Sequence, residues 1–416
     1  MKQTEMFKSL RNILLALLLI FFFNSQSYSG GGQIKLAELK AKIDSILKSI
    51  DNCTVSAKLM SASKNDVLYE YEPNIKIIPA SITKLITAST AIYVLGTGYQ
   101  FKTIVYTDDI NIKEGVINGN VYIKGFGDPD FTNSDVTNLA QQICNKGIKT
   151  IKGNIIYDDS FLDDKHYGLA NYYKGDTQFK DWPYVCALSL DKNKQYKNPP
   201  NQAAQYLLED LKAKEVQIDG IVVSGVTPSG SKELAIIQRS LFEVISNMNK
   251  PSDNQSAITL YKVIGAVYDS PPGTLKKGTE AIIDFLTSIN TDRGSYDFVE
   301  GSGLSRYNYV TASLYMRLLK YMYDDEKTFE TFYQSLAIAG IDGTLKKRMV
   351  NTEAEKNIHA KTGTLRDVST LTGYAVSRDN ELLMFYIAMN GVEGKTNYYR
   401  NRQDDICDLI CQFTRK

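Results

Sequence analysis

Histidine is nearly absent from this chain: its 416 residues include only two, His166 and His359. A Ser-His-Asp triad would have to use one of them, and nothing in the sequence around either favours it. The five cysteines are too few for a disulfide framework and odd in number, and no Cys-x-x-Cys occurs. A zinc site is therefore not expected, and neither a metal nor another cofactor is implied. Gly-x-Ser-x-Gly, His-Glu-x-x-His, Walker and Gly-x-Gly-x-x-Gly patterns are missing too. Any catalysis must use a base other than histidine.

An excess of charge of one sign is also lacking. The chain has 48 Lys+Arg against 47 Asp+Glu, a formal net charge of +1. Without a global positive field, nucleic acid is not an expected partner. The 43% hydrophobic and 23% charged residues exclude wholesale disorder. The length favours two domains, or one domain with a large insert.

Only one long apolar run is present, Ile13–Phe23, and it is preceded by three cations (Lys2, Lys8 and Arg11). This run is too short for a bilayer core, which needs about 20 residues in a helix. A charged start, a short apolar run and a small-x-small end at Ser27-Tyr28-Ser29 are typical of a signal peptide. We expect residues 1–29 to be cleaved near Ser29, with an uncleaved N-terminal anchor as the alternative. The product is expected to be exported to the periplasm or cell-wall space without stable membrane insertion.

Along the rest of the chain, the pattern of predicted helices and strands changes twice. Residues 30–99 read as helix, two strands and helix, and residues 100–239 read as short β-rich runs with two helices. One of those β-rich runs is Val116–Lys124. Residues 240–416 read as long helices, one of them over 327–339, then three strands and a final helix. This order predicts an α+β fold in which 30–99 and 240–416 form one discontinuous domain, with its sheet built from both ends. Residues 100–239 are then an inserted α+β domain.

A candidate nucleophile and base lie in Ser81-Ile82-Thr83-Lys84. Residues three apart share a helix face, so the amine of Lys84 can reach the hydroxyl of Ser81. A desolvated lysine can lose its proton near neutral pH and activate a serine. Ser-x-x-Lys recurs elsewhere in the chain, and by itself it is most often a solvated surface pair. Ser81 differs because an apolar helix continues from it, which predicts that Lys84 is buried.

Two further fragments extend the pattern. Ser252-Asp253-Asn254 falls on a predicted connection between helices, and Lys361-Thr362-Gly363-Thr364 ends a predicted strand. Alone, the first would be a helix N-cap and the second a strand-end turn. Gly363 would allow a ligand to approach the backbone closely. Ser-x-x-Lys, Ser-Asp-Asn and Lys-Thr-Gly in this order form the signature of penicillin-recognising serine enzymes.

These motifs, with Glu300-Gly301-Ser302-Gly303-Leu304-Ser305 and Gly125-Phe126-Gly127-Asp128-Pro129, resemble D-alanyl-D-alanine carboxypeptidases/endopeptidases of the penicillin-binding protein 4 type. The resemblance runs from about residue 34 to the C-terminus and implies a penicillin-recognising serine transpeptidase/β-lactamase-like domain with an insert. Two departures stand out. The nested third domain of larger members is missing after Leu190, and Glu300 replaces the usual Asp, which leaves its role open.

The resemblance implies a role for each matching residue. Ser81 attacks the D-Ala carbonyl and forms an acyl-enzyme, with Lys84 as its base. Ser252 relays a proton to the leaving amine, and Lys361 lowers the pKa of its neighbours by like-charge repulsion. The family further implies that Asn254 binds the substrate backbone and that the N–H groups of Ser81 and Thr364 form an oxyanion hole. It also implies that Lys361, Thr362 and Thr364, flanking Gly363, hold the terminal carboxylate.

The implied partners are peptidoglycan stem peptides and β-lactams. A serine β-lactamase, a pure transpeptidase and a non-catalytic wall-binding protein are the alternatives. The sequence separates neither carboxypeptidase from endopeptidase activity nor a monomer from a homo-oligomer.

Overall fold

The computed structural model describes residues 32–170, 172–391 and 394–416. The expected signal peptide, residues 1–29, lies outside the described residues. Residues Ile34–Lys416 pack as one compact unit. Within the described ranges, no helix is long and apolar enough to cross a membrane.

A six-stranded antiparallel sheet joins strands from both ends of the chain, in the order β13-β14-β15-β16-β1-β2. Its strands are β1 (Thr54–Ser61), β2 (Val67–Tyr71), β13 (Ala337–Ile338), β14 (Ile358–Leu365), β15 (Val368–Val376) and β16 (Leu382–Asn390). On β16, Phe385 and Ile387 face one apolar core while Met384 and Tyr386 face another. Because successive side chains alternate between faces, a strand covered on both sides is apolar throughout. The expected α+β fold, with a sheet built from both ends, is confirmed.

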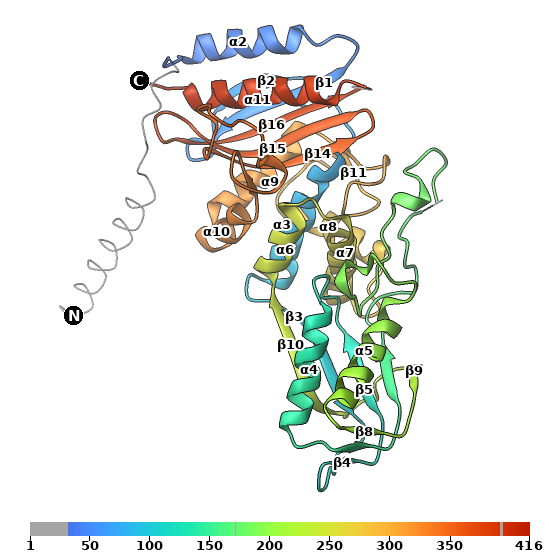
Figure 1. Ribbon diagram of the computed structural model, residues 1–416. Coiled ribbons are helices and arrows are strands. Elements are labelled where there is room, and N and C mark those ends of the chain that lie inside the picture. Colours follow the sequence, from blue (N-terminus) through green and yellow to red (C-terminus); the bar gives the residue numbers. More distant parts are fainter. Residues whose placement is uncertain (1–31, 171, 392–393) are drawn as a thin grey trace, which may run out of the picture. The chain divides into compact units, whose positions relative to one another are not determined.

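One face of this sheet is covered by two helices, α2 (Leu36–Lys48) and α11 (Thr396–Gln412), which lie side by side (Figure 1). The other face packs against a helical layer. That layer contains α3 (Thr83–Leu95), α6 (Leu241–Asn249), α7 (Asn254–Tyr268), α8 (Leu275–Ser288), α9 (Ala312–Asp324) and α10 (Glu326–Gln334). In α3 every residue from Thr83 to Ile92 is buried, so this helix is enclosed on all sides.

Residues 100–240 form a second, five-stranded sheet in the order β10-β3-β5-β7-β9, with a separate apolar core. Its strands are β3 (Gln100–Thr107), β5 (Val121–Gly125), β7 (Ile155–Asp158), β9 (Val222–Ser224) and β10 (Lys232–Ser240). Helices α4 (Asn133–Asn145) and α5 (Pro199–Ala213) contribute side chains to that core. Short strands β4 (Val116–Ile117), β6 (Thr150–Ile151) and β8 (Gln217–Ile218) make a small parallel sheet, and β11 (Tyr296–Asp297) pairs with β12 (Tyr309–Val310). The division at 99/100 and 239/240 stays a prediction, because residues 34–416 form a single unit.

Two predicted elements differ in the structure. Val116–Lys124 is interrupted at Asn118–Asn120, so that β4 and β5 belong to different sheets. The carboxylate of Asp108 accepts the Asn120 N–H at 2.7 Å and holds this turn. The helix predicted over 327–339 ends at Gln334, and Ala337–Ile338 pairs with β14 instead. The apolar residues there suit either structure, and pairing with β14 decides between them.

Candidate active site

Ser81 lies in a 3-10 turn, Ala80–Ile82, that leads directly into α3. The turn is tight, since buried Ala80 has φ of +50°. Gly303 packs against it, and a Cβ at that glycine would lie 1.9 Å from the Ala80 carbonyl oxygen. Gly303 also has φ of +78°, a conformation that favours glycine. The turn that carries Ser81 is thus held from outside by the loop that begins at Glu300.

Lys84 is fully buried one helical turn from Ser81, as predicted. Its Nζ donates to Ser81 Oγ at 2.9 Å, to Asn254 Oδ1 at 2.7 Å and to the Ser302 carbonyl at 2.6 Å. Burial lowers the pKa of Lys84 to about 8, against the opposing effect of Glu300 and Asp253. When the amine is neutral, two N–H groups can stay on Asn254 and Ser302 while the lone pair faces Ser81. This is the arrangement that a general base for Ser81 requires.

A second serine–lysine contact, between Ser252 and Lys361, joins the predicted connection between helices to the predicted strand, β14. Lys361 on β14 is fully buried, and its Nζ donates to Ser252 Oγ at 2.7 Å and to the Thr362 carbonyl at 2.9 Å. Ser252 precedes α7 with φ of +64°. Burial, and then the charge of Lys84, hold the pKa of Lys361 well below its ordinary value. The expected like-charge effect therefore acts on Lys361, whereas burial is the chief cause of the low pKa of Lys84.

Gly363 brings β14 against the nucleophile turn. A Cβ there would lie 2.1 Å from Thr370 Oγ1, 2.6 Å from the Pro79 carbonyl oxygen and 3.1 Å from the Ser81 nitrogen. The close approach expected at this glycine is thus made by the chain's own backbone. Thr364, the next residue, is exposed. The Thr362 hydroxyl donates a hydrogen bond to the hydroxyl oxygen of Thr344 at 2.8 Å.

Glu300, whose role the sequence left open, lies fully buried beneath this site. Its carboxylate accepts from Ser302 N at 2.6 Å, Ser302 Oγ at 2.5 Å and Gly303 N at 2.7 Å. It also accepts from Ser305 N and from the Asn308 side chain. Since the Ser302 carbonyl accepts from Lys84, Glu300 shapes the loop that positions the base.

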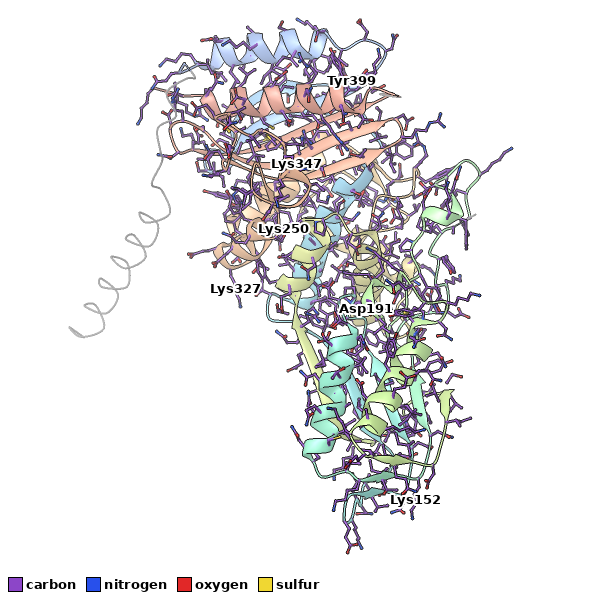
Figure 2. The ribbon with its side chains drawn as sticks, in the orientation of Figure 1. Lys152, Asp191, Lys250, Lys327, Lys347 and Tyr399 are labelled. Atoms are coloured by element: carbon purple, nitrogen blue, oxygen red, sulfur yellow. The ribbon has the colours of Figure 1, made fainter. Side chains whose placement is uncertain are left out.

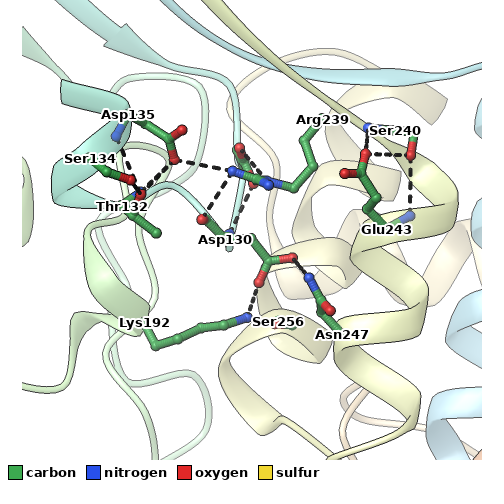
Figure 3. Close-up of polar contacts among 11 residues, drawn as sticks. Asp130, Thr132, Ser134, Asp135, Lys192, Arg239, Ser240, Glu243, Asn247 and Ser256 are labelled. Atoms are coloured by element: carbon green, nitrogen blue, oxygen red, sulfur yellow. Dashed lines mark hydrogen bonds and ion pairs between the residues drawn. The ribbon is translucent and has the colours of Figure 1, made fainter. Parts of the chain in front are cut away.

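Sequence reasoning missed Lys192, which ties residues of the 100–240 segment to the Ser252-Asp253-Asn254 motif. Its Nζ donates to Ser256 Oγ at 2.6 Å and pairs with Asp130 (Figure 3). It also lies 3.7 Å from Asp253 Oδ1. Asp253 in turn caps α7 by accepting from the Ser256 N–H at 2.7 Å. No signal in a single sequence indicates such a contact.

The backbone that presents Lys192 is unusual. Asp191, Lys192 and Asn193 have φ of +46°, +59° and +58°, three successive left-handed residues without a glycine. Asp191 lies between the five-stranded sheet and the helical layer (Figure 2). Such conformations cost roughly 1–2 kcal/mol per residue and persist only where the surroundings impose them.

The family model for the D-Ala-D-Ala carboxypeptidase 3 (S13) family matches residues 39–198 and 193–412. The chain belongs to this family. It is 25% identical over 403 residues to the D-alanyl-D-alanine carboxypeptidase DacB of Haemophilus influenzae. The matched region covers 79% of this chain and 84% of that protein. A D-alanyl-D-alanine carboxypeptidase of an Actinomadura species is 24% identical over 447 residues, covering 86% and 82%. The family resemblance seen in the motifs is confirmed.

Solved structures confirm the fold of this S13 family member. The crystal structure of penicillin binding protein 4 from Haemophilus influenzae matches with a TM-score of 0.77 at 22% identity, covering 88% of this chain and 97% of that one. A penicillin G-acylated predatory endopeptidase from Bdellovibrio bacteriovorus matches with a TM-score of 0.57 at 18% identity, covering 86% and 93%.

A pocket of about 660 Å³ lies beside the motifs of this S13 family member. It is lined by Leu304, from the loop that Glu300 shapes, and by Leu365, which directly follows Thr364. Charges of both signs reach it from Asp176, Arg306 and Asp367. Arg306 pairs with Asp367 at 2.8 Å, and Asp176 accepts from the Arg306 N–H. The pocket therefore has room for an elongated polar ligand.

The two histidines and five cysteines take no part in the site. His359 stacks on Tyr333, and burial lowers its pKa to about 4. His166 stacks on Tyr184. All five cysteines are free thiols, and the described residues contain no group of three His, Cys, Asp or Glu able to hold a metal ion.

Proposed function

We propose that this protein is a serine D-Ala-D-Ala carboxypeptidase, a D,D-endopeptidase or both, which cleaves peptidoglycan stem peptides through an acyl-enzyme on Ser81. The observation that carries the proposal is the 2.9 Å contact between Lys84 Nζ and Ser81 Oγ. Lys84 is buried, oriented by Asn254 and Ser302, and has a pKa near 8, so its neutral form is accessible at working pH. Family membership and the named activities of the relatives supply the reaction class.

In the proposed mechanism, Ser81 Oγ bonds to the carbonyl carbon of the penultimate D-Ala as its proton passes to Lys84. The N–H groups of Ser81 and Thr364 stabilise the resulting oxyanion, and each such donor is worth roughly 3–4 kcal/mol. The C–N bond then breaks, and the leaving amine takes a proton through Ser252, which Lys361 contacts at 2.7 Å. Water attacks the acyl-enzyme, releases the shortened peptide and restores Ser81. Asn254 orients both Lys84 and the substrate backbone, and Thr362, Gly363 and Thr364 form the strand edge along which the substrate lies.

β-Lactams should acylate the same serine, since relatives of this fold include a penicillin G-acylated endopeptidase. We also propose that residues 1–29 are removed near Ser29 and that the enzyme works in the periplasm or cell-wall space. The discontinuous domain of 30–99 and 240–416 would carry the chemistry, with 100–239 as its insert.

The test is the intact mass of the purified protein after incubation with benzylpenicillin, alongside Ser81→Ala. One stoichiometric adduct on the wild type alone is expected, and its slow loss would distinguish a peptidase from a β-lactamase. Well-folded wild-type protein without an adduct would refute the mechanism and favour the non-catalytic wall-binding alternative.

A further inference from the structure

Arg400, on helix α11, reaches the end of the strand that carries Lys361. Its guanidinium Nη2 donates to Thr364 Oγ1 at 3.1 Å. Arg400 is half-buried and follows Tyr399, a buried residue on the α11 face that packs on the sheet (Figure 2). The contact links two segments 36 residues apart in the chain. It belongs to none of the sequence motifs.

Within the described part of the chain the charge of Arg400 is only partly compensated, by the more distant charge of Asp404. The nearby carboxylate of Asp404 is taken by Arg348, whose Nη2 and Nε contact it at 2.6 and 2.9 Å. Among the described residues, no carboxylate lies within ion-pair distance of Arg400. Burial, and then the charge of Arg348, lower the pKa of Arg400. A half-buried guanidinium in this state is stabilised by an incoming anion, because the anion restores the lost solvation.

The position of Arg400 beside Thr364 indicates which anion fits. Thr364 directly follows Gly363, and a Cβ added to that glycine would lie 3.1 Å from the Ser81 nitrogen. An anion held between Thr364 and Arg400 is therefore next to the nucleophile turn. In a D-Ala-D-Ala peptide the terminal carboxylate is separated from the attacked carbonyl by a single residue, about 3.8 Å from one Cα to the next. The hydroxyl of Thr364 is exposed, so it is open to such a ligand.

We infer that Arg400 is a specificity residue that binds the carboxylate of the residue leaving after cleavage, together with Thr364. This inference rests on the proposed function. The planar guanidinium offers a forked pair of N–H donors that matches a carboxylate, and its contact with Thr364 Oγ1 aims the fork along the strand edge. Arg400 acts on substrate binding and takes no part in bond breaking.

The experiment compares two tripeptides, one ending in D-Ala-D-Ala with a free carboxylate and one with that carboxylate amidated. Each is assayed with the wild type, Arg400→Gln and Arg400→Lys by kcat and KM, or as a competitor of benzylpenicillin acylation where turnover is slow. The matched control is Arg402→Gln on the same helix, since Arg402 pairs with Asp405 and does not contact β14. Thermal unfolding checks that every variant is folded.

For Arg400→Gln we expect kcat/KM on the free acid to fall about tenfold, through a rise in KM. This is the size of effect that the loss of a charge-assisted hydrogen bond produces. On the amidated peptide, kcat/KM of Arg400→Gln should fall less than twofold. On the free acid, Arg400→Lys should recover part of the lost kcat/KM, and Arg402→Gln should have the kcat/KM of the wild type. An unchanged KM, or equal losses on acid and amide, overturns the inference. Wild-type protein that processes neither peptide and takes no penicillin refutes the proposed function itself, an outcome distinct from an active enzyme indifferent to Arg400.

Discussion

Replacing Lys192 by Met tests whether the residues of the 100–240 segment control the active site. The substitution keeps most of the length of the side chain and removes its charge, which leaves Asp130 and Asp253 without their shared cation. Breaking a buried ion pair costs about 3–5 kcal/mol. Because the Lys192 side chain is 25% exposed, we expect the free energy of unfolding to fall by less than this, by about 2 kcal/mol.

The effect on acylation should be comparable in free energy to the effect on stability. Asp253 caps α7, and the residues on either side of it contact two buried lysines: Ser252 contacts Lys361, and Asn254 contacts Lys84. Misplacing such groups by about 1 Å can cost about a hundredfold in rate. We therefore expect benzylpenicillin acylation to slow by roughly 10- to 100-fold in protein that remains folded.

The pH profile separates this role from a purely structural one. Burial lowers the pKa of Lys84, and the charges of Glu300 and Asp253 raise it. Lys192 lowers the pKa of Asp253 and offsets its charge. Without Lys192, the carboxylate acts on Lys84 uncompensated, so the pKa of Lys84 rises and the acid limb of acylation moves to higher pH.

The assay is the rate of adduct formation by mass spectrometry across pH, with chemical unfolding measured in parallel. Lys194→Met, an exposed lysine two residues away, is the matched control and should leave both unchanged. A Lys192→Met protein that acylates at the wild-type rate with the same pH profile would refute the reasoning.

Three other outcomes are expected. Wild-type acylation should rise with pH and level off above about 8, because the neutral form of Lys84 is the base; a rate flat across neutral pH contradicts that role. Glu300→Gln should destabilise the fold by roughly 2–4 kcal/mol in urea unfolding and slow acylation, because its amide nitrogen would face the N–H donor of either Ser302 or Gly303. Gly363→Ala should slow acylation at least about tenfold, since its Cβ would push β14 off the nucleophile turn. Gly98→Ala, with nothing within 4 Å of its Cβ, is the control, and equal rates for the two variants would show that β14 can yield.

Much of the site could be predicted because its chemistry is local in sequence. The spacing of Ser81 and Lys84 follows from the helical repeat, and the apolar residues after Lys84 indicate its burial. The order of the motifs then identifies the family, and with it the fold. The order of helices and strands likewise predicts a sheet built from both ends of the chain.

The contacts that organise the site could not be predicted, because they join residues far apart in the chain. Lys192 is an ordinary charged residue until folding brings it to Asp253, and Arg400 reaches Thr364 only when α11 packs on the sheet. Glu300 is a visible departure from the family motif, but its function depends on backbone N–H groups whose direction no sequence pattern states. The end of α10 could not be placed, since the residues after it suit either a helix or an edge strand.

The pairing of β1 with β16 has a consequence for biogenesis. Thr54 lies opposite Asn390, so β1 can pair with β16 only after some 336 further residues have been synthesised. Strands β3, β5 and β7 find their partners within much shorter stretches of chain and can assemble earlier. Lys361 belongs to the late sheet, so a nascent chain that has already made Ser81 and Lys84 still lacks the strand that completes the site. Hydrolytic competence therefore requires strands from the last part of the chain as well as the turn that carries Ser81.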